Sequence, residues 1–442
     1  MFTKLRALAV KSQDALPTGT AAVGAGIAIS ALTSYVFVIV ALNSLDGSSK
    51  AAFSAFWAVV FVVGPGFFLP LEQEIGRALS HRRSQNTGGR PLVERAARLG
   101  AIITAVLIVL TIAATPILTK ELYHGDTFFA VSLSVALVGF FAMSLTKGVL
   151  AGEGRFRAYG ELIAGEGIIR LVLAVALTLA GVENAALFAL CLGVAPLLAL
   201  PFALRSQRGV LKPGPEAPWS ELSVNIGWLL AASVATQALA YAPLLGVNLL
   251  ATADEKVIVT GFASAFFIAR VPVLAFQAVQ GTLLPKLAGL AGAGRHDEFR
   301  SGLKRLMVVV VGIGVLGTVG AFLLGPFVGK ILFKDFTMDA GGLALLSAGS
   351  GMFIIALTMA QALMALGGHK ITAFAWGAGM MVSIGVMAVV EPLELRVDLG
   401  FLTGSFVVAV AMGVALWRRQ RLMVDVGIGP LIDAIEHEPL EI

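Results

Sequence analysis

Residues 262–285 read FASAFFIARVPVLAFQAVQGTLLP, an almost wholly apolar stretch with one charged residue, Arg270. Such a stretch is long enough to cross the ~30 Å hydrocarbon core of a bilayer as a helix. An arginine at that depth keeps its charge, so it needs a carboxylate, water in a cavity or an anionic ligand beside it. The sequence has no acidic residue between Glu255 and Asp297. Arg270 therefore has no partner on its own predicted helix.

The rest of the chain has the composition of a polytopic membrane protein. Of its 442 residues, 57% are hydrophobic and 13% are charged, whereas an ordinary soluble domain carries about 25% charged residues. Twelve apolar runs are long enough to span a bilayer as helices, and none has the alternating pattern of a membrane barrel. They are residues 17–42, 51–71, 97–119, 128–150, 161–181, 184–204, 222–250, 257–284, 303–328, 340–366, 371–390 and 398–417. We therefore expect an all-α protein with twelve transmembrane helices.

Lysines and arginines predict the orientation of these spans. Assigned to the segments between spans, 24 of them lie on the side of both chain ends and 6 on the other side. Because basic residues concentrate in cytoplasmic loops, both ends are expected in the cytoplasm of a bacterium, with the chain in its cytoplasmic membrane. The net charge of +5 is a property of these loops and gives no indication of nucleic-acid binding. Arg170 and Arg270 are the two basic residues left at bilayer depth.

The two halves of the chain match at a near-constant offset, which indicates a duplication. Pro65 falls on Pro272, and TPILTKELY at 115–123 resembles GPFVGKILF at 325–333. Each half has an even number of spans, so both halves enter from the same side and the pseudo-two-fold axis runs along the membrane normal. We predict two parallel six-helix lobes at 1–204 and 222–417, joined by a cytoplasmic linker at 205–221 and followed by a cytoplasmic tail at 418–442.

Polar residues inside the spans are the candidates for substrate binding: Arg270, Arg170, Gln277 and Gln237. On a helix Gln277 lies on nearly the same face as Arg270, two turns further on. Arg170 follows Glu166 by four residues, a spacing typical of an ion pair on one helix face. This spacing predicts either a self-neutralised pair inside the bundle or an arginine of a cationic cavity, with Glu166 tuning it or carrying a proton.

Two further carboxylates, Glu72 and Glu74, follow the segment GPGFFLP at 64–70. Its two prolines are expected to kink or break the helix. A pair between Glu74 and Arg77 explains that acid near the cytoplasmic face, and ion coupling or gating by Glu72, Glu74 or Glu166 is the alternative.

The sequence lacks the motifs of several functional classes. There are no paired catalytic carboxylates, no zinc-spaced histidines and no serine nucleophile motif, and the single cysteine, Cys191, lies in a predicted span. We therefore expect neither an enzyme nor a metal site or other cofactor. The last two spans are expected to contain no charge. Without a nucleotide-binding domain, energy would come from an H⁺ or Na⁺ gradient, the membrane potential or the substrate gradient.

Three features together resemble a known family: the two parallel halves, the second span running into LEQEIGRAL at 71–79, and the connection LAGEGRFRAYGE at 150–161. They are similar to the lipid-linked oligosaccharide flippases, the polysaccharide-biosynthesis branch of the multidrug/oligosaccharidyl-lipid/polysaccharide (MOP) exporter superfamily. The resemblance implies two lobes around a cationic cavity that turn a polyprenyl-diphosphate-linked sugar to the outer leaflet by alternating access. Related lipid II flippases carry a cavity arginine in the eighth span, which Arg270 matches. They also have fourteen spans and arginines in span 1, which this chain lacks, so a different sugar carrier is expected.

The expected function is therefore that of a flippase for a polyprenyl-diphosphate-linked oligosaccharide or cell-wall precursor. Arg270, assisted by Arg170, would bind the diphosphate, because an arginine fork makes bidentate bonds to such groups. Expected partners are the lipid-linked glycan, membrane lipids, and glycosyltransferases or polymerases of the same pathway. Two alternatives stay open: a drug/cation antiporter of the MATE type, and a non-transporting scaffold of a cell-wall assembly.

Overall fold

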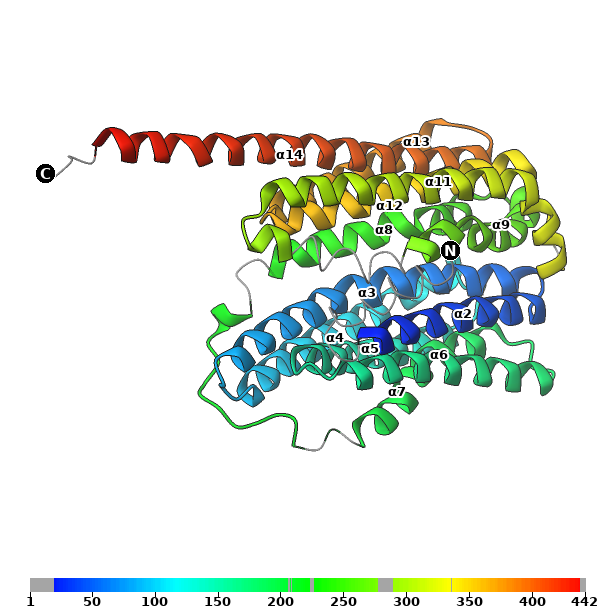
Figure 1. The fold of residues 1–442 in the computed structure, drawn as a ribbon. Coiled ribbons are helices and arrows are strands. Elements are labelled where there is room, and N and C mark those ends of the chain that lie inside the picture. The colour runs from blue at the N-terminus through cyan, green and yellow to red at the C-terminus, as the bar shows by residue number, and fades with distance from the viewer. Residues whose placement is uncertain are drawn as a thin grey trace, which may run out of the picture. The chain divides into compact units, whose positions relative to one another are not determined.

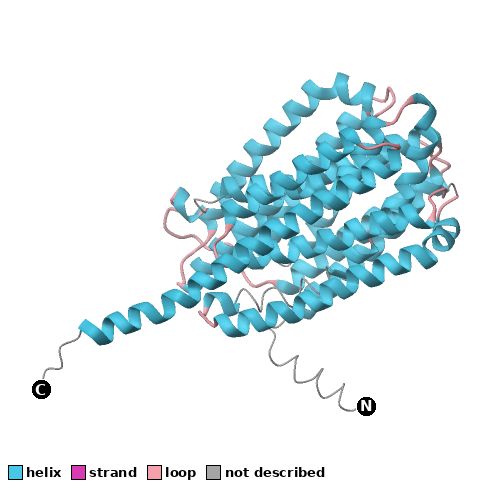
Figure 2. Cartoon of the chain, turned by 90° about the horizontal axis from the view of Figure 1, so that it is seen from above, coloured by secondary structure: helices cyan, strands magenta, loops and turns pink. Residues whose placement is uncertain are grey.

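The computed structural model consists of helices, most of them joined by short connections, with a longer one between α7 (Ala185–Leu204) and α8 (Ile226–Leu250) (Figures 1 and 2). It describes residues 20–205, 207, 209–222, 226–276, 289–334 and 336–437. These ranges contain no β-strand. Twelve helices within them are long and apolar enough to cross a membrane, which confirms the predicted all-α class and number of spans.

The helices keep the labels of Figure 1. The first six are α2 (Thr20–Ser44), α3 (Gly47–Ser84), α4 (Arg90–Glu121), α5 (Phe128–Gly152), α6 (Phe156–Leu179) and α7 (Ala185–Leu204). The others are α8 (Ile226–Leu250), α9 (Lys256–Ala269), α11 (His296–Leu332), α12 (Ala340–Ala365), α13 (His369–Val389) and α14 (Leu393–His437). Two single 3₁₀ turns, η1 (Trp219–Glu221) and η2 (Ala253–Glu255), precede α8 and α9.

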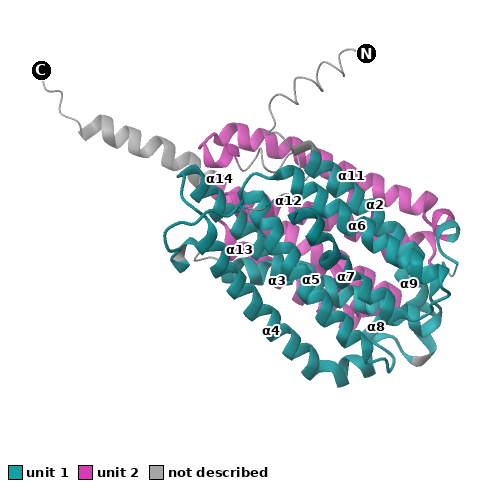
Figure 3. Ribbon diagram, turned by 90° about the horizontal axis from the view of Figure 1, so that it is seen from below, with its two compact units in different colours: residues 1–237, 248–264, 330–336 teal, residues 238–247, 265–329, 337–442 magenta. Residues whose placement is uncertain are grey.

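The chain forms two compact units, coloured separately in Figure 3. Unit 1 comprises Met1–Gln237, Asn248–Ser264 and Lys330–Phe336, and unit 2 comprises Ala238–Val247, Ala265–Gly329 and Thr337–Ile442. Helices α2 to α7 thus belong to unit 1, while α8 and α9 contribute to both units. The lobes predicted at 1–204 and 222–417 stay a prediction.

Helix α3 runs through both of its prolines, Pro65 and Pro70, as one element. The helix break that was expected at GPGFFLP as one of two outcomes is absent. A proline removes one backbone donor, but ending a helix within an apolar run would expose many more unpaired backbone groups to hydrocarbon. Continuation is therefore the less costly solution.

In unit 1, α2 packs closely against α6. A Cβ atom on Gly160 of α6 would lie 2.2 Å from the carbonyl oxygen of Ala22 on α2, so this contact requires glycine. The short distance between the helices brings Ser34 and Phe37 of α2 against Arg170 of α6.

In unit 2, α14 packs against both α12 and α13. A Cβ atom on Gly349 of α12 would lie 2.6 Å from the ring of Phe401 on α14, and one on Gly404 would lie 2.9 Å from the Cβ atom of Ser383 on α13. This packing buries one face of α14 almost completely, including one charged residue: Val397, Asp398, Phe401, Ser405 and Val408.

Candidate functional site

Arg270 lies at an interruption in the helix that begins at α9. α9 ends at Ala269 and helical structure resumes at Val271, so Arg270 itself is not helical. Pro272 has no N–H to donate to the carbonyl of Ile268 one turn earlier, which explains an interruption here. Pro272 thus accounts for a local break beside Arg270.

The guanidinium of Arg270 is partly buried among neutral groups. Its Nη1 donates a hydrogen bond to the carbonyl oxygen of Ala240 at 2.6 Å. Its Cζ lies 4.7 Å from the ring centre of Tyr241 and 5.0 Å from that of Phe266. Among the described residues, no carboxylate lies within ion-pair distance of Arg270. Its positive charge therefore faces a carbonyl dipole and two aromatic rings, and the described residues supply no counter-charge.

Gln277 and Gln237 were also predicted to contact the substrate, and the structure says less about them than about Arg270. Gln277 lies outside the described residues. Gln237 is half-buried in α8 and belongs to unit 1, whereas Arg270 belongs to unit 2. Their joint contact with a substrate stays a prediction.

Arg170 is buried in unit 1 and already has partners. Its Nη1 forms an ion pair with Glu166 at 2.9 Å, and both side chains are about nine-tenths buried or more. Its Nη2 donates to the hydroxyl of Ser34, and its Cζ lies 5.7 Å from the ring centre of Phe37. Of the two interpretations offered for the i, i+4 spacing, the buried ion pair is the arrangement present. A role for Arg170 in substrate binding stays a prediction, as does proton transfer by Glu166.

The two carboxylates after the prolines are also paired inside unit 1. Glu72 accepts from Lys147 Nζ at 2.6 Å and from the hydroxyl of Tyr159 at 2.9 Å. Glu74 accepts two hydrogen bonds from Arg77, at 2.8 and 3.1 Å, which is the pair predicted from sequence. Ion coupling or gating by either acid stays a prediction, but in this arrangement each has a cationic partner.

Asp398 of α14 is the charged group that the sequence analysis missed. The expectation that the last two spans contain no charge is wrong, because the apolar helix begins at Leu393 and Asp398 is 1% exposed. Neither of its carboxylate oxygens has a hydrogen-bond partner in the described part of the chain. Two charged groups act on it electrostatically, Glu394 and Asp339, and both are also acidic.

Buried hydroxyl groups without partners accompany Asp398 in unit 2: Ser347 and Ser350 of α12, Ser383 of α13 and Ser405 of α14. A carboxylate buried without a basic partner is stable only with a proton or a cation bound. The α12–α13–α14 core is therefore a candidate ion site. Periodicity could have revealed it, since Asp398 and Ser405 are seven residues apart on one helix face, together with the apolar Phe401.

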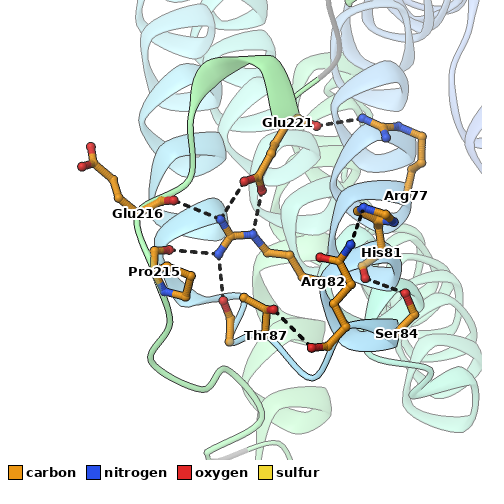
Figure 4. A network of polar contacts seen from close by, with 10 residues as sticks. Arg77, His81, Arg82, Ser84, Thr87, Pro215, Glu216 and Glu221 are labelled. Atoms are coloured by element: carbon orange, nitrogen blue, oxygen red, sulfur yellow. Dashed lines mark hydrogen bonds and ion pairs between the residues drawn. The ribbon is translucent and has the colours of Figure 1, made fainter.

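Within unit 1, a polar network attaches the predicted linker to the end of α3 (Figure 4). Arg82, at the end of α3, is 4% exposed and donates to both carboxylate oxygens of Glu221, at 2.6 and 2.9 Å. It also donates to the carbonyl oxygens of Gly88, Pro215 and Glu216 at 2.9, 3.1 and 3.3 Å. The part of the linker at Pro215, Glu216 and Glu221 is therefore bound to the end of α3 and to the connection between α3 and α4.

Close backbone contact supports this attachment. A Cβ atom on Gly88 would lie 1.9 Å from the carbonyl oxygen of Pro213, and one on Gly214 would lie 2.2 Å from that of Gly88. Arg95 adds a contact to the ring of Trp219, whose centre lies 5.0 Å from its Cζ atom. Glycines at these two positions allow the linker to lie directly on the turn.

The attachment should weaken in acid. The hydrogen bonds from Arg82 hold the pKa of Glu221 below its usual value of about 4.3. A lowered folded-state pKa stabilises the protein above the unfolded-state pKa, and this stabilisation is lost as pH falls through the lower value. We expect the thermal unfolding midpoint of the wild type to fall more steeply below about pH 4 than that of Glu221→Gln. Glu94→Gln, in an exposed pair with Arg90, is the control that should leave the pH dependence unchanged.

Sequence comparisons find similar proteins in mycobacteria. No family model matches the sequence. An uncharacterized protein of Mycobacterium tuberculosis is 28% identical over 423 residues, covering 92% of this chain and 94% of its own. An uncharacterized protein of Mycobacterium bovis is 24% identical over 432 residues, covering 90% and 91%.

Solved structures of similar fold are MATE transporters and relatives in the MOP superfamily. An inward-facing MATE family transporter of the MOP superfamily superimposes with a TM-score of 0.71 at 15% identity, covering 90% of this chain and 99% of that one. A MATE transporter of Vibrio cholerae, solved as a point mutant, gives 0.69 at 15% identity, covering 93% and 98%. A MOP superfamily transporter of Pyrococcus furiosus, described by the reverse polarity of its binding pocket, gives 0.71 at 14% identity, covering 92% and 96%. The chain thus has a MATE-like fold, as the resemblance to the superfamily predicted.

Proposed function

We propose that the chain is a flippase that carries a polyprenyl-diphosphate-linked glycan from the inner to the outer leaflet by alternating access. Its MATE-like fold supports a transport function. Arg270 is the observation that supports an anionic cargo. The substrate would be an oligosaccharide or cell-wall precursor, and the chain would lie in a bacterial cytoplasmic membrane with both ends in the cytoplasm.

The surroundings of Arg270 suit an exchangeable anion. A carbonyl and two aromatic rings stabilise a guanidinium less than a carboxylate does, so an arriving diphosphate gains charge-assisted bonds without displacing an ion pair. Arg170 differs, because Glu166 neutralises it. We therefore assign the main contact with the diphosphate to Arg270, and to Arg170 only assistance. Gln237 and Gln277 would hydrogen-bond the sugar.

A second candidate, a MATE-like cation antiporter, is favoured by Asp398. An antiporter for cations needs a buried acidic group, and Asp398 supplies one in unit 2, with Glu394 and Asp339 as further acids that act on it. The same group also serves the flippase, in which it would bind H⁺ or Na⁺ as the coupling ion. The two candidates therefore differ in the cargo and share the ion site.

Replacing Asp398 should uncouple transport from its ion gradient. In Asp398→Asn the amide takes up no proton near neutral pH and offers no negative charge to a cation, and it fits the same volume. We expect the wild type to respond to an imposed H⁺ or Na⁺ gradient in proteoliposomes and the variant to give the same rate with and without the gradient. Asp297→Asn, on an exposed acid of α11, should behave like the wild type. A variant that keeps the full response would remove Asp398 from the coupling site.

Proteoliposomes with a fluorescent polyprenyl-diphosphate-linked glycan test the function directly. We expect protein-dependent movement of the glycan between leaflets, read as its accessibility to a membrane-impermeant quencher. A protein that leaves the glycan in place but exchanges a lipophilic drug cation for H⁺ or Na⁺ would be the antiporter. A protein that moves neither would support the scaffold, and co-purification with glycosyltransferases or polymerases would then be the relevant readout.

A further inference from the structure

Two adjoining hollows lie at the end of unit 1 where α3 begins and α4 ends, away from the linker contacts at the other ends of these helices. The first is a polar cavity of about 430 Å³ lined by the first turns of α3 and α9 and the last turns of α4 and α8. The second is an open, mainly apolar groove of about 720 Å³ along the last turns of α4. Lys120 lines both, so the two hollows meet at this side chain.

The polar cavity carries more positive than negative charge. Lys120, Lys256 and His124 line it, and Glu121 is its one acidic lining residue. Glu121 pairs with Lys120 at 3.2 Å, whereas no carboxylate of the described residues lies within ion-pair distance of Lys256. Burial lowers the pKa of His124, and the charge of Lys256 lowers it further. Lys256 is therefore close enough to His124 for its charge to disfavour the protonated form of that histidine.

Backbone groups add to this positive potential. Gly47 and Ser48 of the cavity wall form the first turn of α3. Unpaired N–H groups at a helix start carry partial positive charge. Four further acids lie near this end of unit 1, and none of them lines the cavity: Asp46, Asp126, Asp254 and Glu255. Two of these acids have local partners, since Asp126 accepts from the N–H of Phe128 and Glu255 accepts from Thr252.

The groove lies on an exposed apolar face of α4. Its wall is formed by Ile112, Thr115, Pro116 and Thr119 of α4 with the turn that follows. α4 has a long exposed apolar surface, and its large exposed side chains are Ile102, Val106, Val109, Leu110, Ile112 and Ile117. In a membrane-spanning helix such a surface contacts lipid chains.

We propose that the two hollows together bind an anionic phospholipid, with its phosphate between Lys120 and Lys256 and one acyl chain along α4. A headgroup phosphate satisfies the unbalanced charge of the cavity, and Lys120 lies where the headgroup meets the chain. The site lies in unit 1 and uses neither Arg270 nor Asp398, so it is independent of the proposed cargo. In the expected orientation it faces the outer leaflet.

Lipid retention by the purified full-length chain tests the headgroup half of the site. Protein is extracted from nanodiscs of equimolar phosphatidylglycerol and phosphatidylcholine, and bound lipid is measured by native mass spectrometry. We expect retention of phosphatidylglycerol by the wild type and a loss of about tenfold or more in Lys120→Gln/Lys256→Gln, since each lysine near anionic headgroups contributes ~1 kcal/mol. Lys330→Gln, an exposed lysine outside the cavity, is the matched control. Equal retention by wild type and double variant would overturn the proposal.

A second pair of variants tests the acyl chain and separates a lipid from a free anion. Ile112→Trp fills the groove, whereas Ile117→Trp places the same ring on an equally exposed residue outside it. We expect only Ile112→Trp to lower phosphatidylglycerol retention. Inorganic phosphate should compete only weakly because it lacks the chain. Loss of the lipid at low phosphate concentration, with both tryptophan variants unaffected, would show a site for free phosphate and contradict a phospholipid site.

Discussion

Arg270→Gln should reduce flipping of a polyprenyl-diphosphate-linked glycan by about two orders of magnitude. Removing one partner of a close charge pair costs roughly 2–5 kcal/mol. Glutamine keeps a donor for the Ala240 carbonyl, so the local structure has a substitute for the hydrogen bond at 2.6 Å. Arg270→Lys should give an intermediate rate, because lysine keeps the charge but lacks the planar fork. The measurement is the initial flipping rate in proteoliposomes at equal protein content.

The control for Arg270 is Arg305→Gln, an exposed arginine near the start of α11 in the same unit. It should flip at the wild-type rate. Thermal unfolding in detergent separates a lost binding group from a damaged fold, and we expect the unfolding midpoint of Arg270→Gln to stay close to that of the wild type. A stable Arg270→Gln protein with full activity would remove Arg270 from the substrate site.

Arg82→Ala should be the most destabilising single substitution in the linker network. The change leaves a buried space and removes the partner of Glu221 and of three carbonyl oxygens. Loss of one partner of a buried pair costs 3–5 kcal/mol, and because the Glu221 side chain is 31% exposed, water recovers part of this. We expect a loss of about 3 kcal/mol in the free energy of unfolding.

Arg83→Ala is the matched control for this prediction, since Arg83 is the exposed neighbour of Arg82 on α3. Its unfolding midpoint should stay near that of the wild type. Limited proteolysis gives a second readout. Arg82→Ala should be cut in the linker after Arg205 or Lys212 faster than the wild type and faster than Arg83→Ala. Equal stability and equal cleavage of both variants would mean that the network in Figure 4 does not hold the linker.

The number and type of elements could be predicted because each span is a long apolar run. Apolar length alone sets the elements of a membrane protein, so twelve runs correspond to twelve helices. Contacts between residues three or four positions apart on one helix could also be predicted from the sequence. The Glu74–Arg77 and Glu166–Arg170 pairs follow from helical spacing and are present.

The missed features depend on burial and on contacts between distant residues. Asp398 was assigned to the edge of a span because composition cannot tell a charge beside a membrane from one packed inside a helix bundle. Arg82 carries no sequence signal, since all its partners except the carbonyl of Gly88 lie more than 130 positions away in the linker. Of the two outcomes expected at Pro65 and Pro70, a kink or a break, the break is absent, because the hydrocarbon environment favours a continuous helix.

The central claim is that a positive charge at Arg270 selects an anionic, lipid-linked cargo. The most direct measurement compares wild-type flipping of two substrates with the same glycan and polyprenyl chain, one joined through diphosphate and the other through an uncharged ether. We predict that the diphosphate-linked substrate is flipped and the ether-linked substrate is not. Equal flipping of both substrates, unchanged in Arg270→Gln, would contradict the claim.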